Sequence, residues 1–414
     1  MKKGFTLVEL LLVLAIVIVM ATVVILTINP VALIQEGRDA TRVADMNTIT
    51  KAVSLYYSDA MSNPNTLFMG TSSVVYVSIP DATSTAGDQC QGLGLPTLPG
   101  GYTYQCAASS TYKKTNGTGW IPVNFTTVTS SYTAGSVIAN FPVDPINTTS
   151  TNLYYTYQTD GIGGFEVAAF FESQKYASQM EGGSGNDPEL YEKGTAMTLP
   201  SGRGLVGYWP LNEGSGTAAY DQSGAGNNGT WAGTQAGTSG YYSPGHLWSQ
   251  AGYANGTNDT VTAGTASTFV MGTSSFSYGT WIYPTAWPST GPIVTSGADN
   301  GTTNQGFTLR VNAANQLVSM ICDGSIRLTM TVTGIPTSTW SFVFVTINRS
   351  TNIGTAYLNG KAVATENLSG LGSIGQAETL GVIETNYTGE VSDARIYDRS
   401  LSATEVQEMY NADK

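Results

Sequence analysis

Two acids near the C-terminus, Glu390 and Asp393, are the closest approach in this chain to a pair of catalytic carboxylates. Cleaving a glycosidic bond needs one carboxyl group as an acid and a second as nucleophile or base, facing each other across a cleft. Here both acids belong to one strand-like run, GEVSDARIY, without a denser cluster of alternating acids. His246 is the single histidine, and a lone histidine is more often a packing residue than a base. We therefore expect a protein that is not an enzyme.

Another carboxylate, Glu9, precedes a long apolar segment. No charged residue occurs in 10–35, and 10–28 is dominated by Leu, Ile and Val. About 20 apolar residues can cross a bilayer core, and Lys2 and Lys3 would keep the N-terminus cytoplasmic. The segment is longer than a secretory signal core, and no small-residue cleavage site follows it. A plain signal anchor remains an alternative, but it leaves Glu9 unexplained, because an acid near the membrane centre costs at least ~2.5 kcal/mol.

The segment KGFTLVELLLVLAIV accounts for this acid. It resembles the prepilin signal of type IV pilins and of type II secretion pseudopilins. The resemblance implies that a prepilin peptidase removes the leader 1–4 by cutting after Gly4, that Phe5 is then N-methylated, and that Glu9 acts in filament assembly. The new amine of Phe5 could pair with Glu9 of a neighbouring subunit, so that two costly charges become one satisfied ion pair. Residues 5–28 would form a transmembrane helix that becomes the filament core.

The following residues, 29–173, resemble the globular domain of a bacterial pseudopilin. We expect a helix from about Thr6 to about Asp59, kinked at Pro30 because proline lacks a backbone donor. Beyond the proline, apolar residues recur at steps of three and four, which marks one buried helix face. The charged residues between them are expected on the solvated face; they are Arg38, Asp39, Arg42 and Asp45.

A small antiparallel sheet should follow this helix, giving an α+β domain. The strand-like runs are VVYVSI at 74–79, GWIPVNF at 119–125, FPVDPIN at 141–147 and a hairpin within 154–173. Asp144 and Asp160 are interpreted as turn residues, in Asp-Pro and Asp-Gly steps. Cys90 and Cys106 bracket a loop rich in Gly and Pro, and they would form a disulfide outside the cytoplasm.

Composition is typical of an extracellular β-rich protein, since 11% of residues are charged and 48 are glycine. The net charge of -12 disfavours nucleic acid as a partner. Three cysteines are too few for a four-thiolate zinc site.

Residues 174–203 contain GGSGNDPE and TLPSGRG and are expected to form a linker. Strand-like runs then recur over 204–414, with a hairpin signal at Asn359-Gly360. Ser402 and Glu405 have capping-box spacing, which predicts one short closing helix. Many antiparallel strands and few helices predict an all-β jelly-roll sandwich.

This C-terminal part resembles the concanavalin A-like, laminin-G-like jelly rolls of bacterial surface proteins. The resemblance rests on LVGYWPLNEGSG at 205–216, DQSGAGNNGTW at 221–231, AGYANGTNDTV at 251–261 and GEVSDARIYDRSLSATEVQEMYN at 389–411. It implies one structural calcium ion, for which the matched positions are Asp221, Asn228, Asp259 and Asp393. Relatives often carry paired acids where this chain has Asn258-Asp259. The alternative that Asp221 and Asp259 cap turns therefore stays open.

Aromatic side chains of this part could stack on sugar rings. Tyr241, Tyr242 and Trp287 are expected in exposed loops and are the preferred contacts. Four others are each more readily explained by core or rim packing; they are Trp231, Trp248, Trp281 and Tyr283. Cys322 is expected to be a buried thiol.

These parts predict a minor pilin-like subunit that displays a lectin-like jelly roll for adhesion to a glycan or protein. The subunit would sit in the inner membrane with a cytoplasmic N-terminus, and then in an extracellular surface filament. Its partners would be the prepilin peptidase, other pilin subunits and the ligand. A large jelly roll would crowd a filament wall, which favours a minor subunit. Two alternatives remain: a pseudopilin of a type II secretion system whose jelly roll contacts cargo, and a surface-anchored glycan hydrolase.

Overall fold

The structure is a computed structural model. It describes residues 7–28, 30–61, 67–81, 90, 92–96, 98, 102–128, 137–173, 175–176, 180, 187, 190–197, 199, 204–233, 241–242, 245–246, 250–265, 268–288, 290–297, 304–376, 379–383 and 386–413.

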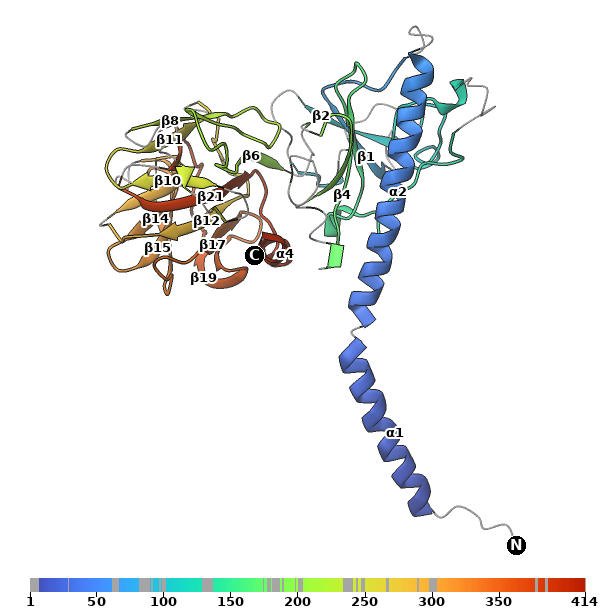
Figure 1. Ribbon diagram of the computed structural model, residues 1–414, viewed down its shortest axis with the longest axis horizontal. Coiled ribbons are helices and arrows are strands. Elements are labelled where there is room, and N and C mark those ends of the chain that lie inside the picture. Colours follow the sequence, from blue (N-terminus) through green and yellow to red (C-terminus); the bar gives the residue numbers. More distant parts are fainter. Residues whose placement is uncertain are drawn as a thin grey trace.

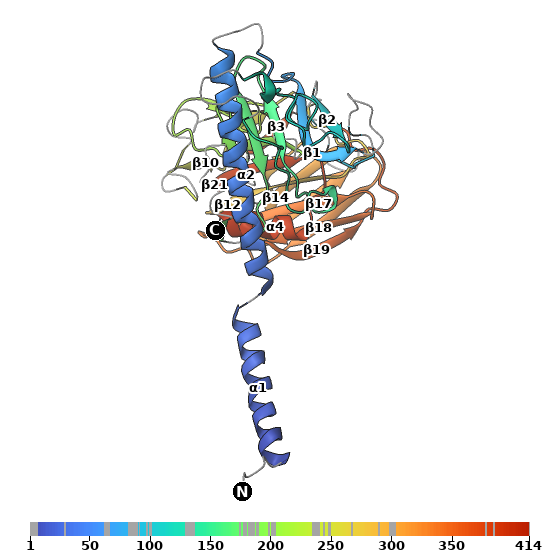
Figure 2. The ribbon, with the colours of Figure 1, turned by 90° about the vertical axis from the view of Figure 1, so that its right-hand side faces the viewer.

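Two helices stacked end to end make a rod at the N-terminus (Figures 1 and 2). They are α1 (Leu7–Ile28) and α2 (Pro30–Ala60). The expected helix is therefore present to within about two residues at its ends, but it is divided at Pro30. This proline is the first residue of α2, where its missing N–H and fixed φ are tolerated. Counting only the described residues, no helix combines the length and the apolarity needed to cross a membrane.

A five-stranded sheet lies against α2, in the order β2-β1-β3-β4-β5. Its strands are β1 (Val74–Asp81), β2 (Thr103–Ala108), β3 (Thr156–Thr159), β4 (Phe165–Ala169) and β5 (Tyr191–Gly194). The expectation of a purely antiparallel sheet is wrong, because β1 and β2 are parallel. The expectation of a structureless linker over 174–203 is also wrong in part, because β5 pairs with β4. Tyr191 stacks on Phe171 at 4.8 Å between ring centroids, which fixes this strand to the core.

The segments 119–125 and 141–147 are not strands, although Trp120, Ile121 and Phe141 are buried in the core. Prolines at 122, 142 and 145 remove ladder donors there. The first segment instead ends in a short 3-10 helix, Phe125–Thr127, which Asn124 caps. In the expected hairpin, the Asp160 carboxylate accepts N–H groups of Ile162, Gly163 and Gly164 within 3.0 Å, which confirms its role in the turn.

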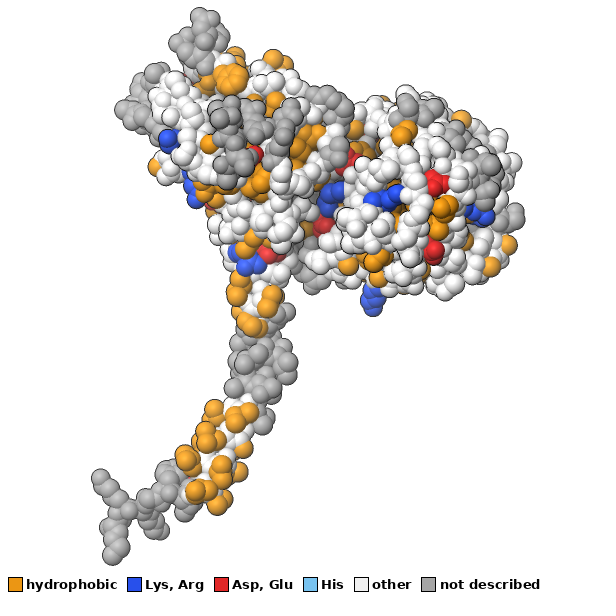
Figure 3. Space-filling model, turned by 180° about the vertical axis from the view of Figure 1, so that it is seen from behind, with side chains coloured by type: hydrophobic (Ala, Val, Ile, Leu, Met, Phe, Trp, Pro, Cys, Tyr) orange, Lys and Arg blue, Asp and Glu red, His pale blue; other side chains and the backbone are white. Residues whose placement is uncertain are grey.

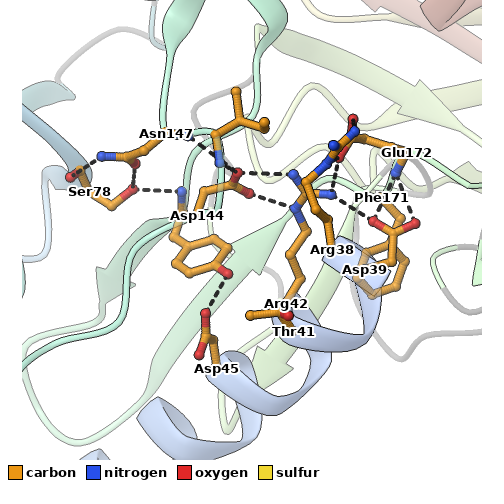
Figure 4. A network of polar contacts seen from close by, with 12 residues as sticks. Arg38, Asp39, Thr41, Arg42, Asp45, Ser78, Asp144, Asn147, Phe171 and Glu172 are labelled. Atoms are coloured by element: carbon orange, nitrogen blue, oxygen red, sulfur yellow. Dashed lines mark hydrogen bonds and ion pairs between the residues drawn. The ribbon is translucent and has the colours of Figure 1, made fainter. Parts of the chain in front are cut away.

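The charged face of α2 is the clearest correction to the sequence-based expectation. Asp39 and Arg42 are completely buried rather than solvated. Arg42 donates to Asp144 from two nitrogens, at 2.7 and 2.9 Å, and to Asp39 at 2.7 Å (Figure 4). Glu172 accepts from Arg42 and from Arg38, each at 2.6 Å. Asp144 also accepts backbone N–H groups of its own turn. The network ties α2 to two loops of the sheet domain.

The C-terminal part is a sandwich of two antiparallel sheets beside the helix-and-sheet domain (Figure 1). One eight-stranded sheet has the order β19-β18-β17-β12-β21-β10-β9, with β6 paired to β21. The other has the order β16-β15-β14-β13-β20-β11-β8-β7. The strands are β6 (Leu205–Trp209), β7 (Ala218–Ala219), β8 (Gly229–Ala232), β9 (Tyr241–Tyr242), β10 (Ala251–Asn255), β11 (Thr260–Ala263), β12 (Phe276–Pro284), β13 (Gly291–Thr295), β14 (Gly306–Asn312), β15 (Gln316–Cys322), β16 (Arg327–Val332), β17 (Ser341–Asn348), β18 (Ile353–Leu358), β19 (Lys361–Asn367), β20 (Leu380–Ile383) and β21 (Thr388–Tyr397).

Strand β17 shows how the alternating sequence serves two cores. Val343 and Val345 face the interior between the sheets, whereas Phe342 and Phe344 face outward and are buried beneath helix α4 (Ala403–Asp413). The capping box of α4 is confirmed: Ser402 N–H donates to Glu405 at 2.7 Å, and Glu405 N–H donates to the Ser402 hydroxyl at 3.2 Å. The hairpin signal is confirmed as well. Asn359 and Gly360 have φ values of 51° and 74° between β18 and β19, as a type I′ turn requires.

Candidate functional site

Glu9 lies in the first turn of α1 and is exposed. The described side chains around it are exposed and mostly apolar; Leu7 is 75% and Met20 is 65% accessible. Figure 3 shows these apolar side chains along the rod. Gly4 and Phe5, the expected processing residues, lie outside the described residues. Large exposed apolar surfaces are typical of sites that contact other proteins or a membrane.

The two cysteines of the helix-and-sheet domain are joined. Cys90 and Cys106 form a disulfide that attaches the 90–106 loop to strand β2. Cys322 lies on β15 and is buried, as expected for an internal thiol.

The predicted calcium ligands Asp221 and Asn228 lie together in the turn that follows β6 and β7. The Asp221 carboxylate accepts backbone N–H groups of Tyr208 and Ser223 at 2.9 Å and of Asn227 at 2.7 Å. The Asn228 side-chain oxygen accepts the Asp221 N–H at 2.9 Å. These contacts are those of a side chain that closes a turn.

The other two predicted ligands are also held by their own surroundings. Asp259 is buried and accepts the Asn255 N–H at 2.9 Å. Asp393 is buried and accepts the Tyr208 hydroxyl at 2.7 Å and the Ser392 hydroxyl. Within the part of the chain that the structure describes, no three His, Cys, Asp or Glu residues form a group suited to a metal ion.

Among the predicted ligand contacts, Trp287 is half-buried in the loop after β12, and its indole N–H donates to the Thr337 hydroxyl at 3.0 Å. Tyr241 and Tyr242 form strand β9, which pairs with β10; their side chains, like Trp248, lie outside the described part. Of the three predicted contacts, Trp287 is the one whose side chain the structure describes.

Instead, the outer face of the β12/β21/β10 strands gathers a different aromatic group. The His246 ring lies 3.7 Å from Trp281 and 5.3 Å from Trp340, and Tyr283 lies 5.5 Å from Trp340. Burial lowers the pKa of His246, which fits a neutral packing residue. Tyr283 is directly opposite Glu390 across the strand pair.

Glu390 itself is only 5% accessible, and its Oε2 has no hydrogen-bond partner. Burial raises its pKa to about 7. Asp393, its neighbour in sequence, is completely buried and engaged by Tyr208. These aromatic side chains therefore serve mainly to pack against one another. A ligand could reach the Glu390 carboxylate only by displacing the side chains that bury it.

A cleft of about 810 Å³ lies between the helix-and-sheet domain and the sandwich. Asn152 reaches across it and donates to Glu405 at 2.9 Å. A second cavity of about 500 Å³ continues along α2 and α4, and a third of about 310 Å³ lies beside β6. Sequence reasoning could not find this cleft, because its walls come from segments far apart in the chain. Figure 3 shows the hollow between the two domains, with charged side chains inside it.

Comparison with known proteins shows which family the sandwich resembles. Residues 255–407 match the family described as the concanavalin A-like lectin/glucanases superfamily. No curated protein matches the chain. Solved structures that match include the binding domain of botulinum neurotoxin serotype G, at 16% identity and a TM-score of 0.39, covering 50% of each chain. The binding domain of Paraclostridial Mosquitocidal Protein 1 matches at 19% identity and a TM-score of 0.41, covering 50% of this chain and 52% of that chain.

This chain spans about half the length of those solved structures. The family match covers most of the sandwich strands and the start of α4, and the two antiparallel sheets have the layered arrangement expected for that family. The C-terminal half of the chain is a concanavalin A-like, laminin-G-like jelly-roll domain.

Proposed function

We propose that the chain is a minor subunit of a pilus-like surface filament, and that its jelly roll adheres to a glycan or protein. The observation that carries the proposal is the position of Glu9 on an exposed apolar helix. An acid at the end of such a helix becomes stable when it pairs with an amine of a neighbouring subunit. In this proposal Phe5 supplies that amine after cleavage at Gly4, the subunit waits in the inner membrane, and the assembled filament lies outside the cell.

The jelly roll would be the adhesive part. It lies to the side of α2 rather than in line with the rod (Figures 1 and 2), so that the apolar helices could pack together while the jelly roll stays on the outside. The sandwich has the fold of lectins and of enzymes alike, so fold alone does not set its activity. We propose binding rather than catalysis, because Glu390 and Asp393 do not face each other across an open cleft.

The charge of Glu9 provides the test of assembly. In the native cells, Glu9→Gln keeps the size of the side chain but removes its charge, and we expect the subunit to disappear from purified filaments. Glu36→Gln, on the polar α2, is the matched control and should assemble normally. Mass spectrometry of wild-type filaments should show a chain that lacks residues 1–4. Normal incorporation of Glu9→Gln, or retention of Met1, would overturn the filament role.

Adhesion is tested separately, by attachment of wild-type and deletion strains to surfaces coated with polysaccharides or host proteins. We expect the deletion to abolish attachment to at least one surface and the restored gene to recover it. Equal attachment of both strains to every surface would contradict the adhesive role, even if the filaments were present.

A further inference from the structure

Three neighbouring cavities follow the border between the two domains and share wall residues; together they are called the trench. The cavities of about 810 and 500 Å³ share Gln35, Glu172 and Thr404. The cavities of about 810 and 310 Å³ share Ser274, Ser275 and Asp398. Each volume falls within or near the ~300–1,000 Å³ that small-ligand sites occupy, and such sites are common at domain interfaces. An elongated trench suits a chain molecule better than a compact one.

Both walls of the trench are rich in hydroxyl and amide side chains. Thr151 and Asn152 come from the helix-and-sheet domain, whereas Ser275, Asn348 and Thr404 come from the jelly roll. Leu95 and Phe170 add apolar surface. A sugar chain offers many hydroxyl groups that donate and accept hydrogen bonds, together with apolar ring faces, so these walls match its chemistry.

The charged side chains of the trench indicate whether a neutral or an acidic sugar polymer could bind there. Arg399 is paired with Glu405 at 2.7 Å, and Glu172 is paired with the arginines of α2. Asp398 is the remaining acid of these walls, and its Oδ1 is buried. The described walls thus hold no surplus positive charge for a carboxylated or sulfated polymer.

We propose that this trench between the two domains binds a segment of a neutral polysaccharide. The proposal rests on the adhesive function above and names its site and ligand class. It also makes the site composite: the helix-and-sheet domain supplies one wall, so the jelly roll is only part of the binding surface.

Filling the trench tests this proposal on the full chain in detergent. The probes are dextran, mannan and galactan as neutral polymers, with alginate and hyaluronan as acidic ones, measured by retention on immobilised polymer. Thr404→Trp and Thr151→Trp place a large ring into the trench from its two opposite walls, and both threonines are exposed. Thr329→Trp, on exposed β16 outside all three cavities, is the matched control.

We expect wild type and Thr329→Trp to bind at least one neutral polymer equally, and both trench variants to bind it at least tenfold more weakly. Circular dichroism melting curves identify any variant that fails to fold, in which case the other trench variant decides. Equal binding by all four proteins would overturn the trench but leave adhesion intact. Binding of acidic polymers only, or of protein-coated surfaces only, would overturn the ligand class. Absence of binding to all five polymers would overturn the polysaccharide assignment.

Discussion

At the scale of single residues, the most unusual group is a set of buried acids between β4 and β5. Glu166, Glu192 and Asp187 are each at most 3% accessible. Burial raises the pKa of Glu166 to about 8, and burial together with the charge of Glu166 raises the pKa of Glu192 well above its usual range. The two glutamates therefore retain protons near neutral pH and hydrogen-bond to each other.

This pair predicts that the helix-and-sheet domain becomes less stable as pH rises. Folding raises the pKa of Glu166 from its ordinary 4.5 to about 8, so the folded state holds a proton that the unfolded state has released. The free energy of unfolding should thus be highest below pH 4.5 with respect to this group, and should fall between 4.5 and 8. Urea titrations should show that Glu166→Gln reduces the loss between these limits, on the order of 2 kcal/mol.

Glu36→Gln, which removes a half-exposed acid on α2, is the control and should retain the full pH dependence. Parallel losses in wild type and Glu166→Gln would show that other groups cause the effect.

At the scale of elements, α2 is attached to the sheet domain by charge as well as by its apolar face. Met46, Ile49 and Val53 enter the apolar core, while Arg42 holds Asp39 and Asp144 in a region without solvent access. A buried ion pair adds little to stability compared with a well-packed apolar pair, but removal of one partner leaves the other charge buried and uncompensated. The network thus specifies where α2 docks.

Arg42→Met should therefore destabilise the helix-and-sheet domain strongly. We expect a loss of about 3–5 kcal/mol in the free energy of unfolding, since Asp39 and Asp144 would be left without their cation. Lys175→Met is the matched control: Lys175 pairs with Glu36 on the surface, and its removal should cause no measurable change. Chemical denaturation of both variants is the measurement. A small effect of Arg42→Met would mean that water replaces the guanidinium.

At the scale of the whole molecule, two separate apolar cores lie side by side. The jelly-roll core and the core beneath α2 share no residue. Among the described residues, a hydrogen bond of 2.9 Å joins Asn152 to Glu405 across the cleft. The two domains should accordingly unfold independently.

Calorimetry should resolve two transitions. Arg42→Met should lower only the transition of the helix-and-sheet domain. Ser402→Ala removes the cap of α4 and should lower only the jelly-roll transition, by about 2–4 °C for a loss near 1 kcal/mol. If either variant moved both transitions equally, the domains would be one cooperative unit.

Much of the fold could be predicted because its signals are local. The alternation in β17, the Asn359-Gly360 turn and the Ser402/Glu405 box depend on residues within a few positions of each other, so the sequence by itself determined the jelly roll and its closing helix. The apolar segment after Glu9 likewise determined the helical rod. These signals need no distant partner.

Tertiary structure alone decided the rest. Arg42 looks like a surface residue until Asp144, 102 positions away, is placed beside it. Strand β5 lies in a segment rich in glycine and polar residues, and it becomes a strand because β4 offers it an edge. The trench exists only where the two domains meet. Burial and pairing between distant segments depend on the packed chain, because desolvation and contact are properties of neighbours in space.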